Sequence, residues 1–376
     1  MKTDWQTKKL GELCDIKTGK KDVNQGNPTG MYPFFTCARD HTYSDEYSFD
    51  TEALLVAGNG DVGHVSYYKG KFEAYQRTYV ISDFRGISPR LLFLFLDGFL
   101  KDTVSKQKLG NTMPYIKMGM LTEFEVPVPP LVEQKVIVKK LDDVFEKVTQ
   151  AKENAENNLQ NSKNIFNSYL AGVFRTVSMK SGVKKLGDAC ESVEYGTSAK
   201  SKKTGKVAVL RMGNIQNGRI DWSSLVYTDD KDEIKKYLLK NNDVLFNRTN
   251  SPELVGKTAI YKGEMPAIFA GYLIRIHRNE KMLGADYLNY FLNSNLAKEQ
   301  GNKVVISSVN QANINGQKLK NYLLPLPSLA EQKTIVKKLD ALSVETKKLE
   351  KVYEQKLADL EELKKSVLSK AFNAEL

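Results

Sequence analysis

One ten-residue string occurs twice in the chain, 198 residues apart. It reads EQKVIVKKLD from Glu133 and EQKTIVKKLD from Glu331, so nine of the ten letters agree. A shorter motif, KKLG, also recurs, once from Lys8 and once from Lys184. Most of the sequence between these shared borders differs. A chain with this pattern is built from two variable domains, each followed by a shared helical segment.

Both copies of the ten-residue string are predicted to open a long helix. A Pro-Pro pair ends at Pro130 before the first copy, and Pro325 and Pro327 precede the second. Proline marks probable helix boundaries. Ser328 and Glu331 also have the Ser-x-x-Glu spacing of a capping box, in which each residue satisfies the other's backbone N–H.

Apolar residues along both segments recur at alternating spacings of three and four. This period is typical of a coiled-coil seam, and a helix packed on a globular core is the alternative. The first helix leads into the second domain and the second helix leaves it, so we expect an antiparallel pair. The predicted seam comprises Ile137, Leu141, Val144, Val148, Ala151, Ala155, Ile165 and Tyr169, interrupted by Asn158 and Ser162, and then Ile335, Leu339, Leu342, Thr346, Leu349, Tyr353, Leu360, Leu363 and Val367.

We therefore predict an α+β fold with an internal pseudo-twofold repeat. Two mixed α/β domains are joined by two long helices that form an antiparallel coiled coil. The predicted segments are a first domain at 1–130, a central helix at 131–179, a second domain at 180–328 and a C-terminal helix at 329–376. We call the two domains head one and head two.

Charge is distributed unevenly between the heads. Residues 1–130 hold 16 Lys and Arg against 16 Asp and Glu, whereas residues 180–328 hold 23 against 14. Head two therefore accounts for most of the net charge of +11. A basic patch favours a nucleic-acid partner, and a well-solvated basic surface is the alternative.

Each head contains a predicted strand, polar loop and second strand. Head one reads EALLVAGNGDVGHVSYYKG from Glu52, and head two reads DVLFNRTNSPELVGKTAIYKG from Asp243. Arginine pairs with guanine and asparagine with adenine in the major groove, although asparagine and glycine also form ordinary hairpin turns. Two later polar loops, KQKLGNTMPYIK from Lys106 and NKVVISSVNQANINGQ from Asn302, suit phosphate or groove contacts. The candidate DNA contacts are Asn59, Gly60, His64, Arg77, Lys106, Lys108 and Asn111 in head one, and Asn247, Arg248, Asn250, Lys257, Ser307, Asn310 and Gln311 in head two.

The sequence contains no recognisable catalytic or metal-binding motif. Three cysteines and three histidines form no CxxC pair, so we expect no metal site. An Asn-Pro-Pro-Tyr/Phe tetrapeptide and a glycine-rich methyl-donor fingerprint are both absent. The N-terminus resembles no signal peptide, which predicts a cytoplasmic protein. The alternatives to a non-catalytic DNA reader are a self-contained methyltransferase or nuclease fragment, and a spacer that binds only proteins.

Taken together, the paired helix openings, the paired KKLG motifs and the two-head order resemble the specificity (S) subunit of type I restriction–modification systems. The resemblance covers the whole chain. It implies two target-recognition domains, each reading part of an asymmetric bipartite DNA site. It also implies two methyltransferase (M) subunits that carry S-adenosylmethionine, and restriction (R) subunits that use ATP and magnesium and join through the M–S core. No cofactor is then expected in this chain.

An M subunit that serves two unlike heads should contact what the heads share. The resemblance therefore directs attention to the repeated helix openings. The predicted M-subunit contacts are Glu133, Gln134, Lys139, Lys140, Glu331, Gln332, Lys337 and Lys338.

Overall fold

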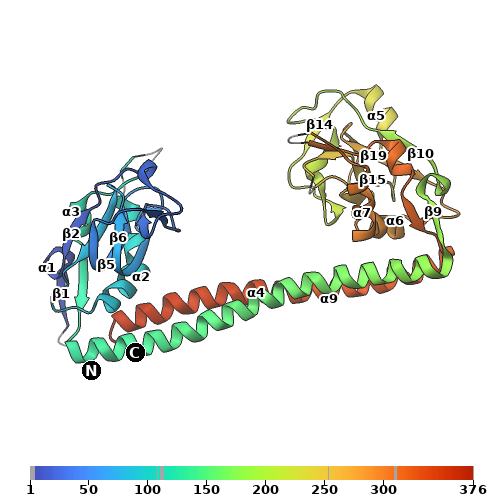
Figure 1. Cartoon of the computed structure of the whole chain (residues 1–376). Helices are drawn as coiled ribbons and strands as arrows, with labels where there is room; N and C mark the ends of the chain where they lie inside the picture. Colours follow the sequence, from blue (N-terminus) through green and yellow to red (C-terminus); the bar gives the residue numbers. More distant parts are fainter. Residues whose placement is uncertain (1–4, 108, 111–113, 253, 309–310, 376) are drawn as a thin grey trace. The chain divides into compact units, whose positions relative to one another are not determined.

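The computed structural model describes residues 5–107, 109–110, 114–252, 254–308 and 311–375. It divides into two compact units (Figure 1). Unit 1 is Met1–Glu156 with Glu354–Leu376, and unit 2 is Asn157–Tyr353. The two long helices, α4 (Leu131–Ser181) and α9 (Leu329–Phe372), therefore each contribute one half to each unit.

Head one of unit 1 is built on a six-stranded sheet of order β2-β7-β5-β6-β3-β4. Its strands are β1 (Gln6–Lys9), β2 (Asp15–Thr18), β3 (Tyr32–Phe35), β4 (Thr42–Ser44), β5 (Phe49–Ala57), β6 (Val65–Ala74), β7 (Thr78–Ser82) and β8 (Glu125–Val128). Its helices are α1 (Leu10–Leu13), η1 (Val23–Gln25), α2 (Pro89–Gln107) and α3 (Met118–Thr122). Successive side chains of β5 point to opposite faces, so Leu54 and Val56 join the core beneath α2 while Leu55 joins a smaller cluster behind the sheet.

Head two has the same plan with additional strands. Its main sheet has the order β10-β19-β15-β17-β13-β12, beside the smaller sheets β14-β11-β18 and β16-β21-β20. The strands are β9 (Val183–Lys185), β10 (Cys190–Tyr195), β11 (Val207–Leu210), β12 (Ile215–Gln216), β13 (Gly218–Ile220), β14 (Val226–Thr228), β15 (Val244–Asn247), β16 (Thr249–Asn250), β17 (Thr258–Ile260), β18 (Ala267–Phe269), β19 (Leu273–Arg278), β20 (Ile306–Ser308), β21 (Gln311–Asn313) and β22 (Leu323–Pro325). The helices are η2 (Leu186–Ala189), η3 (Met212–Asn214), α5 (Lys231–Tyr237), α6 (Ala285–Leu292), α7 (Asn295–Val304) and α8 (Gly316–Lys320). The predicted strand, loop and second strand correspond to β5 and β6 in head one and to β15 and β17 in head two.

The repeated KKLG motif closes each head. In both copies it leads out of a short strand that pairs with the strand just before the long helix, as β1 with β8 and β9 with β22. The leucine of the motif is fully buried in each case. The N–H of Leu10 donates to the carbonyl of Phe124, and that of Leu186 to the carbonyl of Tyr322, both at 2.8 Å. The motif thus brings the first and last strands of each head together.

In unit 1 the halves of α4 and α9 run antiparallel. Lys152 pairs with Glu361 at 2.6 Å, and the ammonium of Lys364 lies 5.6 Å from the ring centre of Phe145. Moving backward along α4 thus corresponds to moving forward along α9. The end of α9 then enters the core of head one, where Phe372 packs against aromatic side chains of α2.

In unit 2 the other halves of the same helices pack in the core of head two. Leu170 and Phe174 of α4 share one cluster with Leu339 of α9. The predicted capping box is confirmed, because Glu331 N–H donates to Ser328 Oγ at 3.3 Å and Ser328 N–H donates to Glu331 Oε2 at 3.0 Å. The predicted fold of two α/β heads with an antiparallel helix pair and an internal repeat is therefore confirmed.

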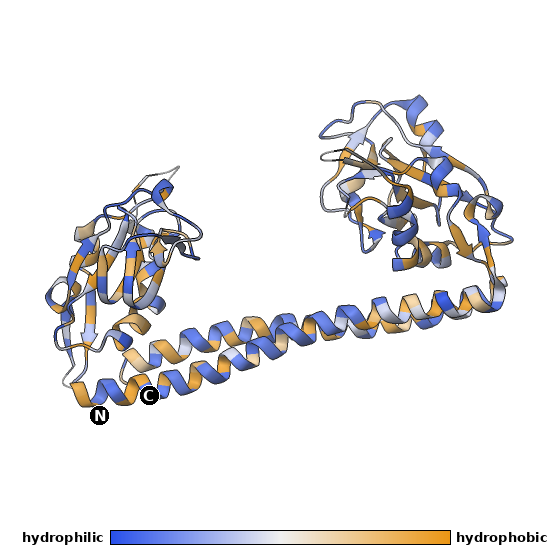
Figure 2. Cartoon of the chain, in the orientation of Figure 1, coloured by the Kyte–Doolittle hydropathy of each residue, from blue (hydrophilic) through white to orange (hydrophobic). Residues whose placement is uncertain are grey.

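Part of the predicted seam is wrong. The misassigned residues are exposed by 42–50% and are Ile165, Tyr169, Leu349 and Leu363. In α4 the buried stripe instead continues from Ser162 through Phe166 and Leu170. These buried residues are each four positions apart, which suits a helix that packs against the core of head two. A coiled-coil seam instead requires spacings that alternate between three and four residues. Figure 2 shows apolar and polar residues alternating along both helices. Within the described residues, no helix is both long and apolar enough to cross a membrane.

Candidate nucleic-acid interface

A glutamine of the repeated string anchors α4 to head one. Gln134 is only 1% exposed. Its Nε2 donates to the carbonyls of Pro129 at 2.8 Å and Gly86 at 3.0 Å, while its Oε1 accepts from the N–H of Ser88 at 2.7 Å. The amide therefore ties the opening of α4 to the segment that leads into α2.

The second glutamine repeats this arrangement in head two. Gln332 is also 1% exposed and donates to the carbonyls of Pro327 at 2.9 Å and Met282 at 2.8 Å. Its Oε1 accepts from the N–H of Gly284 at 2.8 Å, just before α6. The prediction that the two glutamines contact a partner subunit is wrong, because each amide is buried and hydrogen-bonded inside its own unit.

The aspartate that ends each string also contacts its own head. Arg90 of α2 donates to Asp142 at 2.6 Å, and the hydroxyl of Tyr290 of α6 donates to Asp340 at 2.6 Å. The leucine before each aspartate is fully buried. Much of the repeated string is therefore explained by the way each helix docks on its head.

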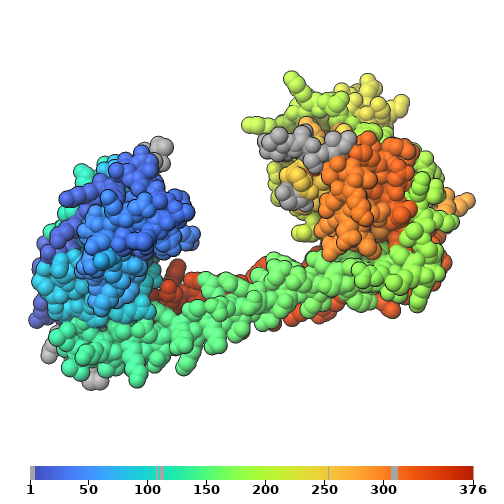
Figure 3. All heavy atoms as spheres, viewed as in Figure 1, coloured from blue at the N-terminus to red at the C-terminus, as the bar shows by residue number. Residues whose placement is uncertain are grey.

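The remaining predicted partner contacts are more accessible. Glu133 is half-buried and accepts a hydrogen bond from the indole N–H of Trp5 at 2.9 Å. Glu331 is exposed, and its hydrogen bonds from Ser328 lower the pKa of its carboxyl. The four predicted lysine contacts are exposed, and these are Lys139, Lys140, Lys337 and Lys338. In the space-filling view, much of α4 lies at the surface (Figure 3).

In head one, four chain segments meet at the loop between β5 and β6. Gly58 donates its N–H to the carbonyl of Arg77 at 3.0 Å and accepts from the N–H of Ile116 at 2.9 Å. The thiol of Cys37 donates to the same Arg77 carbonyl at 3.4 Å. The Arg77 side chain is exposed at this edge. These bonds place the predicted loop beside residues far away in sequence.

Three of the other predicted contacts of head one lie on this loop. Asn59 is half-buried, and Gly60 is exposed with a φ of +65°, which favours glycine. His64 is half-buried, with its Nε2 3.4 Å from the hydroxyl of Ser66. Lys106 is exposed near the end of α2, whereas Lys108 and Asn111 fall outside the described residues.

An ion cluster that the sequence analysis missed supports the same loop. Asp61 accepts from Arg39 at 3.2 Å and from Lys101. The hydrogen bond from Lys101, and then that from Arg39, lowers the pKa of the Asp61 carboxyl. Asp61 thus brings two cationic side chains to this edge of head one, although the head as a whole has equal numbers of basic and acidic residues. Sequence spacing gave no signal, since the partners are 22 and 40 residues from Asp61.

In head two, one predicted base contact is wrong. The side chain of Asn247 is 0% exposed, and its Nδ2 lies 3.5 Å from the carbonyl of Leu254. It belongs to the inside of the loop. Lys257 is half-buried and donates to Gln216 at 3.2 Å. Asn250, also half-buried, accepts from the N–H of Ser251 at 2.9 Å.

Arg248 lies where the predicted loop meets two other segments. Its guanidinium lies 4.9 Å from the ring centre of Tyr195, and Nη1 donates to the carbonyl of Gly271 at 3.4 Å. Its backbone donates to Tyr272 at 3.0 Å and accepts from Ile314 at 2.9 Å. The side chain is half-buried at the surface of head two.

The last predicted loop of head two contains strands. β20 and β21 pair with each other, and β21 pairs with β16 next to Arg248. Ser307 and Gln311 therefore have strand backbone, which corrects the predicted loop, while Asn310 falls outside the described residues. A lysine-rich segment at 200–206 was not selected, although its composition was a visible signal. It follows Thr197, whose backbone bonds to Gly271 at 2.7 Å.

The hydrogen bonds align the two heads residue by residue. Gly58 donates to Arg77 and accepts from Ile116, as Arg248 donates to Tyr272 and accepts from Ile314. Each head therefore has one arginine in this equivalent backbone hydrogen bond. Arg77 supplies the carbonyl in head one, and Arg248 supplies the N–H in head two. The two heads thus share the backbone arrangement at these positions but carry side chains of different length and chemistry there.

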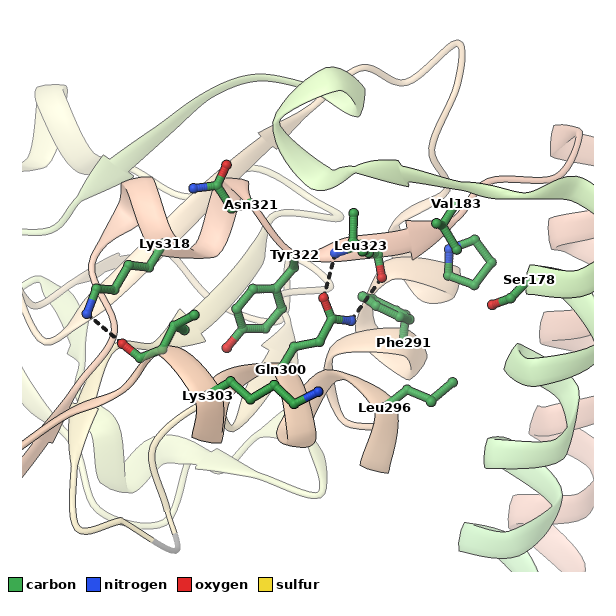
Figure 4. Close-up of a pocket in the computed structure, with 12 residues that line it drawn as sticks. Ser178, Val183, Phe291, Leu296, Gln300, Lys303, Lys318, Asn321, Tyr322 and Leu323 are labelled. Atoms are coloured by element: carbon green, nitrogen blue, oxygen red, sulfur yellow. Dashed lines mark hydrogen bonds between the residues drawn. The ribbon is translucent and has the colours of Figure 1, made fainter.

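Unit 2 also contains a cavity of 390 Å³ (Figure 4). It lies between the end of α4, α7 and β22, and its apolar lining includes Phe291 and Tyr322. Gln300 exchanges two hydrogen bonds with the backbone of Leu323 at its wall. No predicted contact lines this cavity, so it lies apart from the candidate interface. Within the described residues no cluster of His, Cys, Asp or Glu could hold a metal ion.

Comparison with known proteins decides what this arrangement is. The type I restriction modification DNA specificity domain matches twice, at residues 2–161 and 179–359. The chain belongs to this family. The EcoDI specificity subunit of Escherichia coli is 29% identical, over 99% of this chain and 89% of that protein. The MjaVIII specificity subunit of Methanocaldococcus jannaschii is 26% identical, over 97% and 91%.

Solved structures agree with the fold of this type I specificity subunit. A chain from a type I restriction–modification system superposes with a TM-score of 0.78 at 18% identity, covering 99% of this chain and 98% of that chain. The HsdS subunit of Thermoanaerobacter tengcongensis gives 0.56 at 17% identity, covering 100% and 98%. Since the family is that of the specificity subunit, the chain itself is not the catalytic component.

Proposed function

We propose that this specificity subunit reads an asymmetric, bipartite DNA site, with one half-site for each head. The observation that carries the proposal is that two heads of one fold display different side chains at matching backbone positions. Gly58 and Arg77 stand in head one where Arg248 and Tyr272 stand in head two. Different side chains read different base edges, so the two half-sites differ in sequence.

Phosphate contacts are proposed to hold each head in register. In head one, Arg39 and Lys101 pair with Asp61 of the loop between β5 and β6, and Lys106 is exposed near the end of α2. In head two, the lysine-rich segment at 200–206 is exposed and pairs through the backbone of Lys202 with Tyr227. Such contacts contribute affinity and salt dependence rather than sequence preference.

The chemistry is proposed to belong to partner subunits. Two methyltransferase subunits that carry S-adenosylmethionine bind the paired helices, and restriction subunits that use ATP and magnesium join through that complex. Exposed Lys139 and Lys140, with Lys337 and Lys338, support this surface because the buried residues of the same strings are occupied by their own heads. The complex acts on DNA in the cytoplasm.

Methylome sequencing of the source cell, with and without this gene, tests the proposal. We expect one bipartite methylated-adenine motif to disappear on deletion and to return on complementation. An unchanged methylome contradicts the proposal. As a control, the purified chain with S-adenosylmethionine and DNA should transfer no methyl group; transfer by the chain alone indicates a fused methyltransferase instead.

A further inference from the structure

Two adjacent residues of the head-two loop carry poorly satisfied polar atoms. Within the described residues, buried side-chain atoms without a hydrogen-bond partner occur at Glu233 Oε2, Asn247 Oδ1 and Arg248 Nε. Buried polar atoms are normally paired, because leaving one unpaired costs free energy. Such violations concentrate at functional sites. The loop therefore retains an unfavourable arrangement where the candidate interface lies.

Tyr195 holds the guanidinium of Arg248 from one face. Their centres lie 4.9 Å apart, within the range of a cation–π contact. The tyrosine is itself fixed, because it ends β10, which pairs with β19, and its hydroxyl accepts from the N–H of Gly316 at 2.8 Å. A Cβ on Gly316 would lie 3.2 Å from that hydroxyl oxygen, so glycine suits this close approach.

The guanidinium is held more by its cation–π contact than by hydrogen bonds. Its side-chain hydrogen bond, from Nη1 to the carbonyl of Gly271, is long at 3.4 Å, whereas both backbone groups of Arg248 are well bonded. The contact keeps the guanidinium over the tyrosine ring, and its planar fork of donors is already pre-organised. A fork of donors in a fixed plane matches the O6 and N7 acceptors of guanine.

We propose that Tyr195 is the positioning residue for Arg248, and that the pair reads one guanine in the half-site of head two. The inference rests on the proposed DNA-reading function. Head one offers an internal comparison, because its backbone equivalents of Tyr195 and Arg248 are Thr18 and Gly58, which form no such pair. The effect is therefore confined to one half-site.

The test maps methylated adenines in cells that express the whole complex with variant specificity subunits. Arg248→Ala should lower discrimination at one guanine by about 5- to 150-fold, the range for a bidentate base contact. Tyr195→Leu should relax the same position, and Arg248→Lys should not restore it because lysine lacks the planar fork. Tyr195→Phe keeps the ring and should retain the guanine. Arg219→Ala, which removes an exposed arginine elsewhere in head two, is the matched control.

Three results overturn the inference: an unchanged motif in Tyr195→Leu, an unchanged motif in Arg248→Ala, or loss of the guanine in Tyr195→Phe. Melting temperatures and an intact first half-site show whether each variant is folded. Failure of the proposed function is distinguishable, because the wild-type complex would then give no bipartite motif. If the wild-type motif is present and Arg248→Ala leaves it unchanged, only the inference fails.

Discussion

Two of the three cysteines occupy the same place in the two heads. Cys14 and Cys190 each follow a KKLG motif by the same number of residues. Burial raises the pKa of both thiols to about 12. Only the thiolate reacts rapidly with disulfide reagents, so the raised pKa slows the reaction of both thiols, of which Cys14 is buried and Cys190 half-buried. Cys37, at the head-one edge, is also half-buried, but its thiol makes a solvent-exposed contact with the carbonyl of Arg77.

We therefore predict one fast-reacting thiol in the native chain and three after denaturation, measured with a chromogenic disulfide reagent at pH 8. Cys37→Ser should remove the fast phase. More than one fast thiol in the native chain contradicts the raised pKa of the paired cysteines.

The buried glutamines give a residue-scale prediction about stability. Gln134→Ala removes the three hydrogen bonds of a buried amide and leaves the buried carbonyl of Pro129 without this donor. We expect a loss of about 2–3 kcal/mol in the free energy of unfolding, by analogy with other buried hydrogen-bonding groups. In thermal unfolding this lowers the melting temperature of unit 1 by several degrees, since about 1 kcal/mol corresponds to 2–4 °C at this size. Lys139→Ala, on the exposed face, is the control, and an equal loss in that control would show that the amide is not the cause.

Secondary-structure elements show how far sequence reasoning reaches. The helix openings could be predicted because prolines and a capping box are local signals. Ile165 and Tyr169 were misassigned because the packing partner of α4 changes along its length, which apolar spacing alone does not reveal. Asn247 and Gln134 were misassigned because a polar side chain buried against distant backbone carries no local signature. The Asp61 cluster was missed for the same reason, since its partners are distant in sequence.

At the element scale, the helix openings provide a test of the partner surface. Lys139→Glu combined with Lys337→Glu reverses two exposed charges that belong to both copies of the string. We expect weaker binding of the methyltransferase subunit, measured by calorimetry, while both heads keep their melting behaviour. Lys200→Glu combined with Lys203→Glu, on the lysine-rich segment of head two, is the charge-matched control and should weaken DNA binding instead. Unchanged affinity for the methyltransferase subunit in the double variant contradicts the proposed surface.

For the whole molecule, the length of α4 is proposed to set the spacer between the half-sites. Four residues inserted after Asn157 lengthen a helix by about 6 Å and rotate it by about 400°, leaving about 40°. A base-pair step of about 3.4 Å and about 34° can absorb this change. We predict a spacer longer by one or two base pairs, and poor tolerance of a two-residue insertion. If the methylated sites keep the original spacer, the spacer length is set by other parts of the complex and not by α4.

The central claim is that each head reads its own half-site. The most direct test maps methylated adenines for complexes containing Arg77→Ala or Arg248→Ala, side by side with wild type. The two arginines lie on opposite sides of equivalent backbone hydrogen bonds in the two heads. We predict that each substitution relaxes one position, in different half-sites, and leaves the other half-site and the spacer intact. Relaxation of the same half-site by both variants, or no change in either motif, would contradict the account.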